Sequence, residues 1–260
     1  SRPPLSGFLP YSAYLADEQI FVNQDSLGFC LELIPQSGAD EEMAQILTPL
    51  FAGNRAGAGI QLHLLGSPDI QNIMRNYANL RVPDMDSGEA FRVMRAQRQK
   101  NIYRTMARAR AEYFLQGATR PLIPGYLLRD FRLVLSATIP GNPDDLTRVD
   151  DLMLLRDEIR TTLNAADFAN DDWNAVDLID WASNLLNPQR VFAPGPRAHY
   201  DEGREICDQI IDRDTLVRVT ETGLNFAKPA GDDEIEVRLL SIKNFPPRFS
   251  LWNMGALIGD

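Results

Sequence analysis

The sequence contains no motif for binding the phosphates of a nucleotide. A phosphate-binding P-loop needs glycines for close backbone approach and a lysine directly after a glycine. The three lysines, Lys100, Lys228 and Lys243, follow glutamine, alanine and isoleucine. The glycine-rich run 53–59 precedes a strand-like stretch, whereas a dinucleotide-binding loop follows a strand and opens a helix. We therefore predict a turn at 53–59, no cofactor-binding residue, and no ATP hydrolysis by these 260 residues.

The histidines, cysteines and paired carboxylates lack the spacing of a catalytic or metal site. His63 lies in a strand pattern and His199 in a loop, with no nucleophile elbow or zinc-ligand spacing near either. Cys30 and Cys207 each stand alone among apolar residues, which is typical of buried free thiols. Acidic doublets occur at 144–145, 150–151, 171–172 and 232–233. Because 144–145 and 171–172 fall at predicted helix starts, we interpret the doublets as capping and solvated groups and assign no catalytic or metal-binding residue.

Positive charge is concentrated in one segment of an acidic protein. The net charge of −10 opposes binding to a polyanion, so we expect no direct nucleic-acid binding. Residues 88–117, here called the basic segment, hold seven cations against two carboxylates, a net charge of +5. One interpretation is a solvated helix with ion pairs to the rest of the chain. The other is docking on an acidic partner or on anionic lipid headgroups. The candidate docking residues are Arg92, Arg95, Arg98, Lys100, Arg104 and Arg108.

The first half of the sequence mixes strand and helix patterns. Two strands, 20–22 and 27–34, are predicted around a turn at 23–26. Asp40 can cap a helix that reaches about Phe51, and a strand is predicted over 60–65. Further predicted elements are a short helix from Ser67 to about Leu80, a helix of near thirty residues over 87–117, and a strand over 129–139 with one well-buried face.

The second half of the sequence shows helix patterns first and strand patterns afterwards. Helices are expected from the cap at 142–145 to Leu163, from about Asp172 to Leu186, and over 201–211. Short strands follow at 216–219, 224–226 and 235–242. This order favours an α+β fold, a mixed, mostly antiparallel sheet packed with several helices including one long helix. We predict one domain, 1–260, with lobes at 5–140 (α/β), 141–213 (mainly helical) and 214–250 (returning strands). No apolar run approaches the roughly 18 residues of a membrane span.

Several phrases in sequence order carry a resemblance to one family. In the first third they are LPY at 9–11, VNQDSLGF at 22–29, LEL at 31–33, SGADEE at 37–42, QLHLL at 61–65 and SPDI at 67–70. Later phrases are LRDFRL at 128–133, LLNP at 185–188, YD at 200–201 and LIGD at 257–260. In this order the chain resembles the N-terminal region of TraC-type ATPases of type IV secretion and conjugative transfer, which are similar in plan to the VirB-type secretion ATPases.

The resemblance implies a non-catalytic N-terminal domain that docks a RecA-like motor at the inner-membrane base of the machine. ATP and Mg are then expected in the motor of the parent protein, outside these residues. It also implies inner-membrane secretion subunits as partners, self-association through the parent ATPase, and a cytoplasmic location peripheral to the bacterial inner membrane. The absence of an initial Met agrees with a piece of a longer protein. The alternatives are a metal-dependent hydrolase with an acidic site and a free-standing regulatory binding protein.

Overall fold

The computed structural model describes residues 5–34, 40–52, 57–67, 70, 74, 105–106, 109–117, 128–188, 198–212, 215–227 and 234–240. By its internal contacts the chain divides into two compact units, 1–213 and 214–260. The six candidate docking residues lie outside the described residues, as does most of the two helices predicted between Ser67 and Gly117. Residues 109–116 of the second are helical, and the helix ends at Gly117 as predicted.

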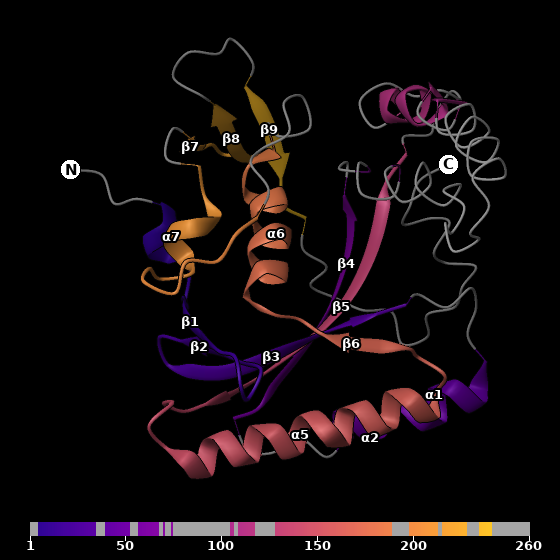
Figure 1. The fold of residues 1–260 in the computed structure, drawn as a ribbon, viewed down its shortest axis with the longest axis vertical. Helices are drawn as coiled ribbons and strands as arrows, with labels where there is room; N and C mark the ends of the chain where they lie inside the picture. Colours follow the sequence, from indigo (N-terminus) through magenta and orange to yellow (C-terminus); the bar gives the residue numbers. More distant parts are fainter. Residues whose placement is uncertain are drawn as a thin grey trace, which may run out of the picture. The chain divides into compact units, whose positions relative to one another are not determined.

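The first unit is built on one antiparallel sheet (Figure 1). Its strands run in the order β1-β2-β3-β5-β4, and β6 pairs with the free part of β3 beyond β2. β3 is central because it pairs along its whole length with β5, from Ser26 opposite Pro140 to Leu33 opposite Leu133. The bounds are β1 Tyr11–Leu15, β2 Ile20–Asn23, β3 Ser26–Leu33, β4 Gly59–Ser67, β5 Asp130–Pro140 and β6 Asn170–Asp172.

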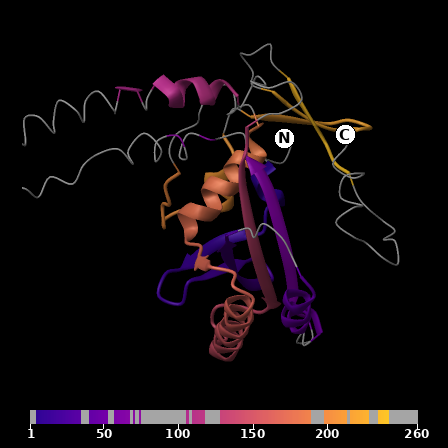
Figure 2. The same ribbon diagram turned by 90° about the vertical axis from the view of Figure 1, so that its right-hand side faces the viewer.

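One face of this sheet is covered by the longest described helix, α5 (Leu146–Ala165). The predicted cap is confirmed: the Asp145 carboxylate accepts hydrogen bonds from the backbone N–H groups of Thr147 and Arg148. Leu152 and Leu155 of α5 join the odd-numbered apolar residues of β3 and β5 in one core. The short helices α1 (Glu41–Leu47) and α2 (Pro49–Ala52) lie beside α5 on the same side (Figure 2).

The opposite face is covered by α6 (Ala175–Leu186) and α7 (Cys207–Ile210). Val134 of β5 is 1% exposed in a second core with Trp173 and Ile179. The sequence predicted one well-buried face for β5, but both faces of its middle are covered. The reason is that α6, far along the chain, returns over the even-numbered residues. The α6 side also includes the 3-10 helix η1 (Leu5–Phe8), which contacts α7.

Four elements differ from the sequence prediction. β1 was not predicted, and β6 occupies residues that were expected to begin a helix. The α6 helix begins later, where the Asn174 side chain accepts from Val176 N and the Asp177 carboxylate accepts from Asn174 N in a reciprocal cap. The interpretation of doublet 171–172 as a helix cap is therefore wrong. The helix predicted over 201–211 is reduced to α7.

The second unit contains a three-stranded antiparallel sheet in the order β7-β8-β9. Its bounds are β7 Leu216–Val219, β8 Gly223–Ala227 and β9 Ile235–Arg238, which confirms the predicted hairpin. The final strand, predicted over 235–242, is present but ends at Arg238. Gly223 is required at the start of β8, since a Cβ there would lie 2.2 Å from the carbonyl oxygen of Val237. Within the described residues no helix is long and apolar enough to cross a bilayer.

Candidate binding pocket

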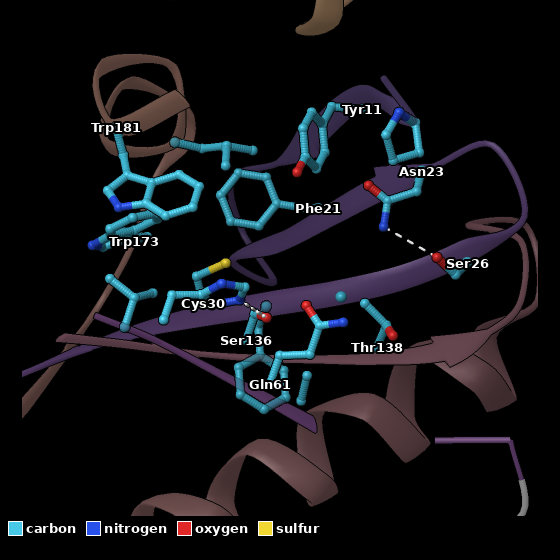
Figure 3. A pocket seen from close by; sticks show the side chains of 17 residues that line it. Tyr11, Phe21, Asn23, Ser26, Cys30, Gln61, Ser136, Thr138, Trp173 and Trp181 are labelled. Carbon is cyan, nitrogen blue, oxygen red and sulfur yellow. Dashed lines mark hydrogen bonds between the residues drawn. The ribbon is translucent and has the colours of Figure 1, made fainter. Parts of the chain in front are cut away.

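A cavity of about 260 Å³ lies between the sheet of the first unit and α6 (Figure 3). Its floor comes from three strands, because alternate residues of paired strands project from the same face. The register sets Gly28 opposite Thr138 and Cys30 opposite Ser136, with Gln61 on the far side of Ser136. Gly28 has no space for a side chain, since a Cβ would lie 2.9 Å from the carbonyl oxygen of Ala137. We call this cavity the aromatic pocket.

Aromatic side chains form much of its wall. Tyr11 and Phe21 come from β1 and β2, Trp173 directly follows β6, and Trp181 comes from α6. Trp173 and Trp181 contact each other with ring centroids 5.8 Å apart. The His63 ring meets Trp181 edge to face at 5.6 Å. The pocket thus presents ring faces and edges to any occupant. The lining comprises Pro10, Tyr11, Phe21, Asn23, Ser26, Gly28, Phe29, Cys30, Gln61, His63, Val134, Ser136, Ala137, Thr138, Trp173, Leu178 and Trp181.

His63 is bonded to a serine that the sequence did not connect with it. Its Nε2 lies 2.9 Å from Ser136 Oγ, and the two residues are 73 positions apart. Burial lowers the pKa of His63 below its ordinary 6.5, which favours the neutral imidazole. A serine-histidine pair needs a third group to orient the base and donors for an oxyanion. No aspartate or glutamate lines the pocket, so the pair serves better as a hydrogen-bonding element than as a nucleophile and its base.

The pocket lining is uncharged. None of its residues is Asp, Glu, Lys or Arg. Burial raises the pKa of the Cys30 thiol to about 12, so it remains protonated at physiological pH. Cys30 and Cys207 are both free, as the sequence predicted. A charged occupant would therefore lose its hydration without gaining a counter-charge, and the pocket favours neutral groups.

An ion-paired cluster beside the pocket holds Trp173 in place. Arg132 Nε and Nη2 donate to the two carboxylate oxygens of Glu32 at 2.9 and 2.7 Å. Trp173 Nε1 donates to Glu32 Oε2 at 2.7 Å, and the Arg132 guanidinium lies 5.2 Å from the Trp173 ring centroid. Asp180 of α6 lies 3.5 Å from Arg132. The carboxylate of Glu32, on β3, thus fixes the positions of both the Arg132 guanidinium and the Trp173 ring.

We predict that Glu32 makes stability depend on acid pH. Burial alone raises its pKa, but the hydrogen bonds from Arg132 and Trp173 outweigh burial and hold the pKa below its ordinary 4.5. A carboxylate with a lowered folded-state pKa stabilises fully above its unfolded value and loses that contribution as the pH falls through the folded value. The difference in unfolding free energy between the wild type and Glu32→Gln should be largest at neutral pH and shrink below about pH 4.5.

Urea unfolding at several pH values measures this difference. Glu202→Gln, which replaces an exposed glutamate, controls for the loss of one carboxylate. If the Glu32→Gln difference stayed constant from neutral pH to pH 3, the pairing would not stabilise the fold in the way described.

The remaining carboxylates do not assemble into a metal site in the described part of the chain. No group of three or more His, Cys, Asp or Glu residues with suitable placement occurs among the described residues. Asp145 caps α5, as predicted. Asp172, within β6, pairs instead with Arg160 and Arg156 of α5. The doublet 232–233 and the candidate docking residues Arg92, Arg95, Arg98, Lys100, Arg104 and Arg108 lie outside the described residues.

Comparison with known proteins points to one family. A family model described as TraC protein matches residues 5–260. Protein TraC of Escherichia coli strain K12 is 24% identical over 257 residues, an alignment that covers 98% of this chain and 28% of that relative. The chain therefore spans little more than a quarter of the length of the relative it matches.

Proposed function

We propose that this chain, which belongs to the TraC protein family of F-type IV conjugative transfer systems, is a docking domain of a longer ATPase. The family match confirms the resemblance read from the sequence. In the proposal, residues 1–260 position a motor at the inner-membrane secretion complex. ATP and Mg are used by the motor, outside these residues.

The docking proposal rests on the position of the basic segment, which lies in the connection between two neighbouring strands, β4 and β5. β4 and β5 are neighbours in the sheet, and Ser67 at the end of β4 pairs with Asp130 at the start of β5. Residues 68–129 therefore leave and re-enter the sheet at the same place. Connections between neighbouring antiparallel strands are usually a few residues long, and much longer ones are commonly functional. This connection carries all of the basic segment.

The described end of that segment combines charge with exposed apolar side chains. Met106, Tyr113 and Phe114 are 49%, 56% and 39% exposed, and Arg110, in the helical stretch 109–116 with Tyr113 and Phe114, is also exposed. Cations next to exposed aromatic and apolar groups suit a surface of anionic lipid and membrane-protein subunits. In the proposal, the basic segment holds the parent ATPase against the cytoplasmic side of the inner membrane. The residues that make this contact are Arg92, Arg95, Arg98, Lys100, Arg104 and Arg108.

The test is a charge reversal in the full-length parent protein. Arg92, Arg95 and Arg98 are changed together to Glu, and recovery of inner-membrane secretion subunits is measured by pull-down from solubilised donor-cell membranes. Each cation near an anionic surface contributes about 1 kcal/mol, so we expect recovery to fall by at least about tenfold. ATP hydrolysis by the purified protein should be retained, because the segment is proposed to dock the motor and not to power it.

A matched control changes three exposed or partly exposed arginines elsewhere, Arg148, Arg204 and Arg238, to Glu. This control alters the net charge by the same amount, so equal losses in both variants would indicate a general charge effect. Unchanged recovery with the reversed basic segment would remove it as the docking surface.

A further inference from the structure

The aromatic pocket contains a buried polar atom that lacks a partner. Asn23 Nδ2 donates to Ser26 Oγ at 3.1 Å, while Asn23 Oδ1 is buried and has no hydrogen-bond partner within the described residues. Figure 3 shows this oxygen on the side of the amide that faces Phe21 and Tyr11, among the lining side chains. Buried polar atoms in folded proteins are nearly always paired, so an unpaired acceptor in a cavity points to an absent donor.

The volume of the pocket limits what the donor can be attached to. Sites for drug-sized ligands and cofactors usually enclose about 300–1,000 Å³, whereas a cavity of about 150 Å³ accommodates benzene. At about 260 Å³ the aromatic pocket suits one ring or one fused pair of rings, and not a nucleotide. Its rings, from Tyr11, Phe21, Trp173 and Trp181, favour an aromatic occupant in stacked or edge-to-face contact.

The lining also sets the charge of the occupant. With no charged side chain, a protonated Cys30 and a His63 held toward its neutral form, the pocket offers nothing to compensate a carboxylate, phosphate or ammonium group. An uncharged ring that carries one N–H or O–H satisfies both the walls and Asn23. Phenol and indole are such rings, and they are the side chains of tyrosine and tryptophan, which anchor many protein interfaces.

We propose that the aromatic pocket receives a single tyrosine or tryptophan side chain of a partner polypeptide, whose O–H or N–H donates to Asn23 Oδ1. This interaction surface lies wholly within the first unit and does not depend on the proposed docking role of the basic segment. A partner with an exposed aromatic anchor would bind across the mouth of the pocket, where Gln61 is exposed and Trp181 and Asn23 are partly buried.

Fragment titration of the 1–260 chain tests the chemistry. The probes are p-cresol and 3-methylindole, which match the tyrosine and tryptophan side chains, toluene, which lacks the donor, and benzoate, which is charged. Backbone amide shifts of Cys30 and Ser136 in NMR spectra report occupancy. We expect p-cresol and 3-methylindole to bind about tenfold more tightly than toluene, and benzoate to produce no shift at these amides. Equal affinity for toluene and p-cresol, or no binding of any ring, would overturn the proposal.

Two variants separate the hydrogen bond from the cavity. In Asn23→Ala the acceptor is gone, so the advantage of p-cresol over toluene should disappear while toluene still binds, which shows that the pocket has survived the change. In Ser26→Ala the bond from Asn23 Nδ2 is lost but the acceptor remains, so the advantage should persist. If p-cresol retained its tenfold advantage in Asn23→Ala, Asn23 would not be the recognising group.

A final titration tests whether the occupant of the pocket belongs to a polypeptide or is a free small molecule. N-acetyl-tyrosinamide and N-acetyl-tryptophanamide carry the backbone that a partner would bring, and we expect them to shift the same amides as p-cresol. If p-cresol bound but N-acetyl-tyrosinamide and N-acetyl-tryptophanamide did not, the pocket would be a site for a free phenol or indole. The assignment to a partner side chain would then be wrong. Neither result bears on the basic segment, so the docking proposal stands or falls separately.

Discussion

Replacing Leu152 by alanine should lower the free energy of unfolding of the first unit by about 3 kcal/mol. Leu152 is fully buried in α5 and belongs to the core that joins this helix to β3 and β5. The change removes apolar contacts and leaves a cavity, because the surrounding Leu31 and Leu135 are themselves completely buried and are held in the middle of the sheet. Urea unfolding followed by intrinsic fluorescence in a Trp252→Phe background, where Trp173 and Trp181 are the remaining tryptophans, measures the loss.

The same helix offers a matched control for this prediction. Leu154 lies two residues further along α5 and is 52% exposed. Leu154→Ala makes the same chemical change at nearly the same place and should cost less than about 1 kcal/mol, as is usual for exposed positions. Similar losses for the two variants would mean that α5 does not pack on the sheet through the face that contains Leu152.

Replacing Asn187 by leucine should cost about 2 kcal/mol and loosen α7 from α6. Asn187 is completely buried at the end of α6. Its Nδ2 donates to the carbonyl oxygens of Ser183 and Ile210, and its Oδ1 accepts from the backbone N–H of Asp212. Leucine of similar size would remove the acceptor of Asp212 N–H. The carbonyl oxygens of Ser183 and Ile210 would each lose one donor but keep another, the backbone N–H of residue 187 and Ser183 Oγ. The cost is therefore about that of one buried polar group that loses its partner, about 1–3 kcal/mol.

Two measurements distinguish this effect from a general loss of stability. Hydrogen exchange should accelerate at Ile210 and Asp212 by more than at β3. The control is Asn164→Ala, which removes an exposed asparagine whose Oδ1 accepts a hydrogen bond from Asn170 Nδ2, and should change stability by less than about 1 kcal/mol. Uniform acceleration of exchange over the whole unit would contradict the local role of Asn187.

Local sequence patterns predicted most of the elements correctly. The cap at Asp40 and a helix start within 142–145 could be identified because capping depends on one side chain and the next three N–H groups. The capping bonds are present at Asp40 and, in the second case, at Asp145. The turn between β2 and β3 and the hairpin of β7 and β8 follow from residues a few positions apart. The α+β class and the predominantly antiparallel sheet were likewise confirmed.

The pocket could not be predicted, because it depends on register between distant strands. Nothing near His63 indicates that Ser136 will lie 2.9 Å away, since that contact follows from the pairing of β4 with β5. The same holds for Trp173, which is fixed by Glu32 and Arg132 from two other strands. β6 was missed for a related reason: three polar residues have no strand pattern of their own and pair only because β3 offers a free edge.

The order of strands along the chain also determines when the sheet can form during synthesis. β2 and β3 can pair as soon as they leave the ribosome, but within the described residues the strand partner of β4 is β5, which begins at residue 130. Until then β3 and β4 present unpaired backbone and apolar side chains such as Leu31 and Ile60, which the folded core covers, to other nascent chains. Closing such a distant contact is entropically slow compared with a short hairpin. We therefore expect a stage of synthesis in which these strand edges are open, and the partner strand of both is complete only when residue 140 has been made.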